Sequence, residues 1–153
     1  MVKNIREVSL QQLIEYDSKF AGANRESFVR SWVYERPDAV SKVVVNSSNE
    51  IVGYGTGRLF SIWDSAGFSP VYGDSVLVFL ALFGALAEHF KEQIQRKNVV
   101  DLRVPSIHLK AVRSVLQGIA DVKEVRSSCI SPIALEQPDP ILTSCCHPEL
   151  MIP

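Results

Sequence analysis

The chain contains 153 residues, enough for one domain with a sizeable core, and its 46% hydrophobic and 22% charged residues are typical of globular proteins. A formal net charge of −1 excludes the strongly basic surface that recruits nucleic acid or anionic membrane. The longest uncharged apolar run, residues 76–87, is too short to span a bilayer. We therefore expect neither a nucleic-acid partner nor a membrane partner.

The beginning of the chain and its cysteines indicate an intracellular, cytoplasmic protein. The N-terminal sequence MVKNIREVSLQQ lacks the apolar segment of a signal peptide. An odd number of cysteines, two of them adjacent, does not form a disulfide framework, and this favours a reducing compartment. The three are Cys129, Cys145 and Cys146.

The first part of the chain predicts two helices. Ser9 is a favoured N-cap residue for a helix that ends near Gly22. Asn24 then begins a second, shorter helix, which Pro37 closes. The apolar residues of this second helix fall on one side at helical spacing, and they are Phe28, Val29, Trp32 and Val33.

Three strands are expected next, within VSKVVVNSSNEIVGYGTGRLFSI and the residues that follow it. Two β-branched runs flank Asn46-Ser47-Ser48-Asn49, which is typical of a hairpin. A second turn at residues 63–67 leads to a third strand at residues 68–72. Glycines alternate along the second strand, which indicates either a closely packed helix or a backbone left open beside a ligand. They are Gly53, Gly55 and Gly57.

The longest predicted helix runs from Ser75 to about Lys97, and its first half is apolar on nearly all sides. We expect it to be largely buried, with Phe79, Phe83 and Phe90 in the core.

The remaining elements are a strand at VVDLRVPS, a helix that begins at Ser106, and a strand within DVKEVRSSCISPIALE. The apolar face of this last helix holds Leu109, Val112, Leu116 and Ile119. The expected order is therefore α-α-β-β-β-α-β-α-β, an α/β (α+β) fold in which helices flank a mixed, mostly antiparallel sheet. We expect a single domain over residues 1–137. Residues 138–153 hold four of the eight prolines and predict an irregular C-terminal arm.

The turn between the third strand and the long helix has two interpretations. A strand, a glycine-containing turn and a helix often hold a phosphate on the free N–H groups of the helix N-terminus. Against this, Pro70 has no N–H, and Asp74 places a carboxylate where the helix dipole would favour a phosphate. The chain also has no lysine or arginine between Arg58 and Lys91. We interpret Asp74 as an ordinary N-cap.

The order of elements, with these particular sequences, resembles the GNAT superfamily of N-acetyltransferases over roughly residues 5–136. NEIVGYGTGRL resembles the family's third strand, VVDLRVP the strand after the cofactor helix, and His108-Leu109-Lys110-Ala111 the family's Asn-x-x-Ala. YDSKFAGANRESFVRSW is similar to the C-terminal domain of a subgroup with two GNAT-like domains in tandem.

The resemblance implies acetyl-CoA or another acyl-CoA as cofactor and a small-molecule amine as acyl acceptor. It also implies a second GNAT-like domain or a homodimer partner. In the family the pantetheine arm lies between two diverging strands, bonded to main chain. Carried over to this sequence, the cofactor-binding residues are Val71, Tyr72, Gly73, Asp74 and Ser75.

The sequence departs from the family at two places. The family signature Gln/Arg-x-x-Gly-x-Gly/Ala corresponds to Pro70-Val71-Tyr72-Gly73-Asp74-Ser75, in which Gly73 fits and Pro70 and Ser75 do not. The family's general-acid tyrosine aligns with Val115. We therefore expect weak or absent cofactor binding. Two functions remain: an N-acyltransferase-like domain with a degenerate pyrophosphate-binding turn, or a non-catalytic ligand-binding or structural domain of the same fold.

Other candidate residues have mainly structural interpretations. Tyr72 either packs or lines a pocket. Cys129 is expected to be a buried thiol, and Cys145-Cys146-His147 lacks the spacing of a metal site. His89 has no triad-like partners, and His108 is expected to be exposed. Three arginines form either a solvated face or a site for a carboxylate substrate, and three carboxylates are possible but unplaced bases. These six residues are Arg25, Arg30, Arg36, Glu50, Asp64 and Asp101.

Overall fold

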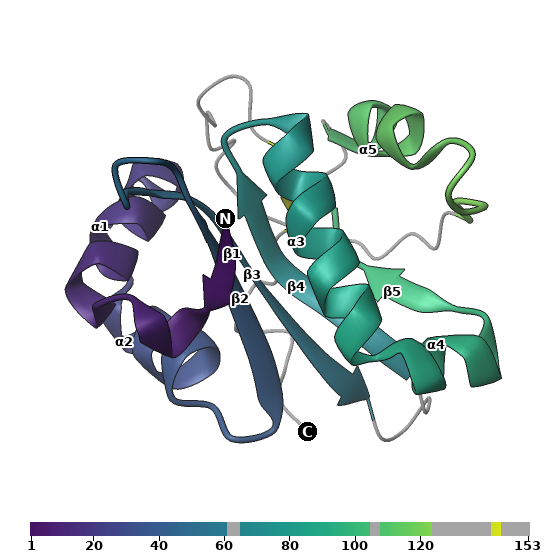
Figure 1. Cartoon of the computed structure of the whole chain (residues 1–153), viewed down its shortest axis with the longest axis horizontal. Coiled ribbons are helices and arrows are strands. Elements are labelled where there is room, and N and C mark those ends of the chain that lie inside the picture. The colour runs from purple at the N-terminus through teal and green to yellow at the C-terminus, as the bar shows by residue number, and fades with distance from the viewer. Residues whose placement is uncertain (61–64, 105–107, 124–141, 145–153) are drawn as a thin grey trace, which may run out of the picture.

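The computed structural model describes residues 1–60, 65–104, 108–123 and 142–144. Its central sheet has the strand order β1-β2-β3-β4-β5, and β6 pairs with β4 beside this path. Figure 1 shows α1 and α2 on one side of the sheet and α3 across the other. The strand pairs are antiparallel except for β4 and β5, which run parallel. The expected mixed, mostly antiparallel sheet flanked by helices is confirmed.

The elements follow the expected order, with an additional strand before the first helix. That strand, β1, has only three residues and was not expected from the sequence. The last expected strand lies outside the described residues. The bounds are β1 Val2–Asn4, α1 Leu10–Ala21, α2 Glu26–Phe28, η2 Val29–Tyr34, β2 Ala39–Val45, β3 Ile51–Phe60, β4 Ser65–Gly73, α3 Val76–His89, α4 Lys91–Lys97, β5 Val100–Leu102, α5 Leu109–Leu116 and β6 Leu142–Ser144, with a short 3-10 turn, η1 Ile5–Glu7, after β1.

The ends of α1 are those the sequence predicts. The hydroxyl of Ser9 accepts a hydrogen bond from the Gln12 N–H, and Gly22 ends the helix with a left-handed φ of 64°. The N-cap of α2 is Arg25, one residue after the expected Asn24, although the Asn24 side chain still accepts a bond from the Glu26 N–H at 2.8 Å. After α2 the backbone widens into a π-helix, η2, which the sequence did not indicate.

The hairpin between β2 and β3 is confirmed, and the strand after it begins earlier than expected. Asn49 takes a φ of 62°, and its N–H donates to the Asn46 carbonyl at 3.1 Å. β4 begins at Ser65 and pairs with β3 from Phe60 onward. Residues 65–67, predicted as part of a turn, are therefore strand.

The alternating glycines of β3 lie under α3, which confirms the interpretation of a closely packed helix and excludes a backbone left open for a ligand. A Cβ on Gly57 would lie 2.7 Å from Cε2 of Phe90, and one on Gly55 would lie 3.4 Å from Cδ1 of Leu86. Ordinary carbon–carbon contact begins at larger separations than the first of these. The missing side chains let α3 approach the sheet.

The long helix differs from its prediction in two ways. It is divided at Phe90, where the backbone leaves helical angles, so that α3 and α4 replace one helix. The apolar helix α3 is also not buried on all sides, because the sheet covers one side of it and the opposite side faces solvent. Phe79 and Phe90 are buried as expected and Phe83 is half-buried, while Leu77 in the first turn is 79% exposed.

The C-terminal parts of the chain are described in fragments. In α5, Val112 and Leu116 are buried, while Ile119, expected on the same buried face, is 60% exposed beyond the end of the helix. Leu142–Ser144, within the arm expected to be irregular, forms β6 in the sheet. Among the described helices, none has the length and apolar character needed to cross a membrane.

The contact between Gly57 and α3 can be tested with a pair of alanine substitutions. Gly57→Ala should lower the free energy of unfolding by about 1–3 kcal/mol, because the new methyl group meets Phe90, Phe68 and Leu86. Gly84→Ala is the control: Gly84 is exposed on α3 with nothing within 4 Å, and the change should stabilise the helix by about 0.5–1 kcal/mol. Chemical denaturation measures both, and a neutral Gly57→Ala would contradict this packing.

Candidate functional site

A β-bulge in β4 sets the geometry of the candidate site. Gly55 pairs with Val71 and Gly57 pairs with Phe68, so that two residues of β4, Ser69 and Pro70, stand opposite the single residue between these glycines. The extra residue reverses the alternation of side chains. Phe68 and Val71 consequently both pack on the α3 side of the sheet, and Tyr72 packs on the α1 side.

The bulge is also the point at which β4 changes its neighbour. Before it, residues 66–68 pair with β5 in parallel, and after it, residues 71–73 pair with β6 in antiparallel fashion. β5 therefore does not follow β4 to its end. The last residues of β4, directly before α3, pair on that side with the three-residue β6 instead. Bulges are frequent beside active sites, where they end strand pairing or re-aim a side chain.

The turn after β4 does not have the cap that the sequence predicted. Ser75 is the N-cap of α3: its hydroxyl accepts a hydrogen bond from the Val78 N–H at 3.3 Å. Asp74 lies one residue earlier, so the interpretation of Asp74 as the N-cap is wrong. The Asp74 N–H donates to the Val52 carbonyl at 3.0 Å. Its carboxylate accepts a bond of 2.7 Å from the Tyr16 hydroxyl of α1.

A buried polar network lies behind this turn, on the α1 side of the sheet. We call Asp17, Arg25, Tyr54 and Tyr72 the Asp17 cluster. Asp17 is completely buried and accepts bonds from Nε and Nη2 of Arg25, at 3.0 and 2.6 Å, and from the Tyr54 hydroxyl at 2.5 Å. Arg25 Nη2 also donates to the Tyr72 hydroxyl at 3.2 Å. A buried carboxylate needs such partners, so the cluster joins α1 and the N-cap residue of α2 to β3 and β4.

Burial and hydrogen bonds determine the protonation states of Tyr54 and Arg25 in the cluster and of Tyr16 beside it. Burial raises the pKa of the Tyr54 hydroxyl, and the nearby Tyr72 and Asp17 raise it further. Burial and the hydrogen bond to Asp74 raise the pKa of Tyr16 in the same way. Burial lowers the pKa of Arg25, but its hydrogen bond to Asp17 and the nearby charges outweigh this effect and raise it overall. Tyr16 and Tyr54 are therefore neutral hydrogen-bond donors, and Arg25 is a permanent cation.

Aromatic contacts complete the wall formed by α1. The ring of Phe20 stacks on Tyr72 with ring centres 5.4 Å apart and planes 8° apart. Tyr54 and Tyr72 lie 5.3 Å apart, centre to centre. Tyr72 is only 4% exposed and is contacted by aromatic rings on two sides. Among the described residues, Tyr72 therefore packs in the core and does not line a pocket.

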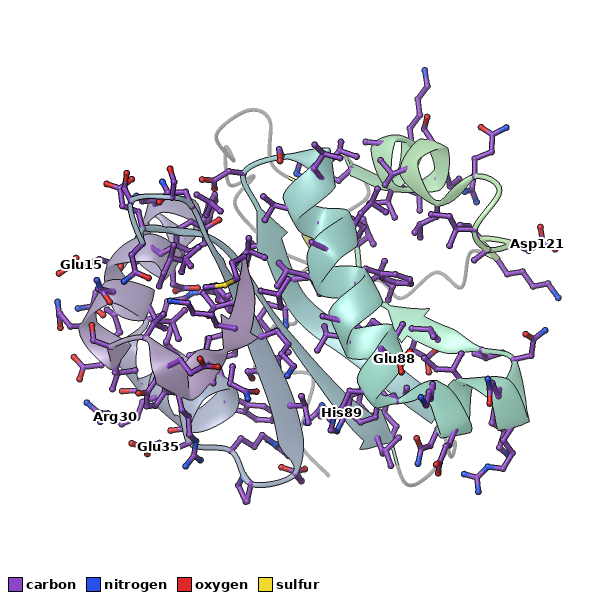
Figure 2. The ribbon with its side chains drawn as sticks, in the orientation of Figure 1. Glu15, Arg30, Glu35, Glu88, His89 and Asp121 are labelled. Atoms are coloured by element: carbon purple, nitrogen blue, oxygen red, sulfur yellow. The ribbon has the colours of Figure 1, made fainter. Side chains whose placement is uncertain are left out.

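The three arginines singled out from the sequence do not share one environment. Arg30 pairs with Glu26 and Glu35 at exposed positions, and Figure 2 shows Arg30 and Glu35 at the outer margin of the helical layer. Arg36 pairs with Asp38 and lies over the Trp32 ring. Arg30 confirms a solvated face, whereas Arg36 is half-buried. Arg25 does not belong to that face, because its guanidinium forms an ion pair with the buried Asp17.

The remaining candidates do not assemble with the turn. Glu50 binds Asn46 within the hairpin, and Asp101 of β5 accepts a bond from Ser65. His89 is exposed at the end of α3. The expectation that His108 is exposed is wrong, because its Nε2 is buried, without a hydrogen-bond partner among the described residues.

Several expected residues lie outside the described part of the chain, namely Asp64, Cys129, Cys145, Cys146 and His147. In the part that the structure describes, no group of histidine, cysteine or carboxylate side chains is arranged to hold a metal ion. A shallow concavity of about 600 Å³ opens beside Arg25, lined by residues 24–28.

Asp17 was missed by sequence reasoning although a signal was present. Leu13, Ile14 and Tyr16 form the buried side of α1, and Asp17 falls four residues after Leu13 on that same side. A carboxylate at a core position requires a cationic or hydroxyl partner, and Arg25 follows within the next loop. No comparable signal indicated Tyr54, because an aromatic residue in a strand is ordinary.

No protein-family model matches the sequence, and no curated protein matches it either. Solved structures do match the fold. The ribosomal-protein-alanine N-acetyltransferase of Brucella melitensis biovar Abortus 2308 aligns with 86% of this chain and 96% of its own, at 12% identity and a TM-score of 0.53. An aminoglycoside antibiotic 6'-N-acetyltransferase of Acinetobacter baumannii aligns with 88% of this chain and 98% of its own, at 6% identity and a TM-score of 0.55. The chain therefore has the GNAT acetyltransferase fold.

The raised pKa values of Tyr16 and Tyr54 predict a stability that falls at alkaline pH. Both hydroxyls ionise less readily folded than unfolded, so their contribution to stability is complete below their ordinary pKa of about 10 and is lost as pH rises above it. Tyrosinate absorbance of these two residues should appear together with loss of the folded circular dichroism signal. In the Tyr16→Phe variant, the rise in tyrosinate absorbance on unfolding should be smaller by the contribution of one tyrosine. Ionisation of both tyrosines before unfolding would contradict the buried network.

Proposed function

We propose that this chain is an acyl-CoA N-acyltransferase-like domain with a degenerate pyrophosphate-binding turn. It holds the acyl-carrying arm of the cofactor on the main chain of β4, holds the phosphates weakly, and passes the acyl group to an amine. The observation that carries this proposal is the bulge at Ser69 and Pro70, after which residues 71–73 leave β5 and pair on that side with only the three-residue β6.

Main-chain recognition suits the pantetheine arm, which is an extended chain with two amide groups. A strand edge offers N–H and C=O groups at regular spacing to any extended amide-bearing partner. Such recognition requires no particular side chain, so it tolerates the departures of this sequence from the family signature. The candidate cofactor-binding residues are then Val71 and Gly73 through their main chain, Tyr72 between them with its main-chain groups on β3, and Asp74 and Ser75 at the phosphate end.

The turn at the phosphate end of the candidate site is poorly suited to the negative charge of the cofactor's phosphates. The carboxylate of Asp74 stands at the positive end of the α3 dipole, and no lysine or arginine occurs from residue 59 to residue 90. Each charge-assisted hydrogen bond that the turn does not make forgoes about 1.5–3 kcal/mol of binding free energy. Two such losses separate micromolar from millimolar affinity, since every 1.4 kcal/mol is about tenfold.

The transfer step needs two proton movements for which this chain provides little. The amine nitrogen attacks the thioester carbonyl, the C–N bond forms and the C–S bond breaks. The amine then gives up a proton, and the thiolate leaving group takes one. Val115, where the resemblance implies an acid, is a partly buried apolar residue packed against the α3-side core. Solvent then has to protonate the thiolate, so we expect transfer to be slow.

A second candidate function is a non-catalytic domain that binds a small ligand or packs against a partner. The bond between Tyr16 and Asp74 favours it, because it uses the carboxylate at the turn for an internal contact between α1 and β4. Acetyl transfer to a panel of small amines discriminates the two candidates. Turnover above the solution reaction supports the transferase, and binding without turnover supports the alternative.

The charge of Asp74 provides the test of the degenerate turn. Wild-type protein should bind acetyl-CoA with millimolar affinity in calorimetry. Asp74→Asn removes the charge and keeps an oxygen acceptor for Tyr16, so affinity should improve about fivefold, equivalent to the roughly 1 kcal/mol that a charge contributes at a helix terminus.

Glu88→Gln is the matched control for this measurement. It changes the net charge equally at an exposed position near the other end of α3, where Figure 2 labels Glu88. This variant should bind like the wild type. Micromolar binding by the wild type, or equal affinities of the two variants, would contradict a turn weakened by Asp74.

A further inference from the structure

The main-chain groups at the end of β4 have directions that the hydrogen bonds determine. The Asp74 N–H donates to Val52 of β3 at 3.0 Å. Groups alternate along an antiparallel strand, so Tyr72 also directs its N–H and C=O toward β3. Val71 and Gly73 then direct theirs to the opposite edge. This edge, with two donors and two acceptors, is called the β4 slot.

A piece of the chain's own C-terminal region occupies this slot. Val71 pairs with Ser144, and Gly73 pairs with Leu142, in antiparallel register. β6 has three residues, whereas β3, on the other edge of β4, has ten. A ladder this short opens more easily than the long one, because few hydrogen bonds close it.

We propose that β6 and the amide-bearing arm of an acyl-CoA are alternative occupants of the β4 slot, so that the C-terminal segment inhibits the site in cis. This inference rests on the proposed function and adds its regulation. Both occupants are extended chains with amide groups, and one pair of donors and acceptors cannot serve both at once. The apparent affinity for the acyl carrier falls by the fraction of molecules in which the slot is open.

The test uses proline substitutions in the 153-residue chain. In β6, alternation directs the N–H groups of Leu142 and Ser144 toward β4 and that of Thr143 away from it. Ser144→Pro removes a donor from the ladder, while Thr143→Pro is the matched control, since proline is tolerated where the N–H faces away from the neighbouring strand. Leu142→Pro is a second, independent variant.

Two measurements are made on each protein. Hydrogen exchange of the Val71 and Gly73 amides should become about tenfold faster in Ser144→Pro and Leu142→Pro, with Tyr72 unchanged because it pairs with β3. Acetyl-CoA should bind the same two variants about tenfold more tightly than it binds the wild type, as expected when a competing state is removed. Thr143→Pro should match the wild type in both measurements.

The outcomes separate this inference from the proposed function. Faster exchange with affinity equal to the wild type overturns competition by β6 and leaves the acyl-CoA site standing. Faster exchange with no detectable binding by any variant overturns both. Unchanged exchange in Ser144→Pro shows that β6 does not hold the slot. Protection of Val71 that rises with protein concentration assigns the strand to a second copy and overturns inhibition in cis.

Discussion

The bulge at Ser69 and Pro70 is the constraint on which the candidate site depends. It inserts one residue into β4, and this insertion places Val71 on the α3 side and Tyr72 on the α1 side. The same insertion coincides with the end of pairing to β5 and leaves an edge for another occupant. Side-chain direction, strand partner and access to the main chain are thus set at one place in the sheet.

The two sides of β4 differ in how firmly they are held. On the α1 side, the ion pair between the buried Asp17 and the half-buried Arg25 joins α1 and the N-cap of α2 to β3 and β4, and removing Arg25 would leave an uncompensated carboxylate in the core. On the edge, a three-residue strand supplies the pairing. A wall held by buried contacts beside a three-residue ladder suits a site whose occupant changes.

The features predicted from sequence are those decided by near neighbours in the chain. The cap of α1 at Ser9, the hairpin at Asn49 and the helix packed on Gly57 each depend on a local pattern or a single periodic face. The bulge and β6 depend on register between distant segments, which no local pattern encodes. The sequence leaves Arg25 open between a solvated face and a carboxylate-binding site, because its partner Asp17 lies in a separate element, α1. The cap predicted at Asp74 is wrong by one residue because Asp and Ser are both favoured caps.

Titration of the 153-residue chain with pantetheine tests the central claim most directly, because this compound carries the two amides of the arm and none of the phosphates. Binding along the main chain of β4 predicts that the amide chemical shifts of Val71 and Gly73 change with ligand concentration, and that those in the first turn of α3 do not follow them. Chemical-shift changes confined to the concavity beside Arg25, or to the first turn of α3, would contradict a site built on the β4 edge.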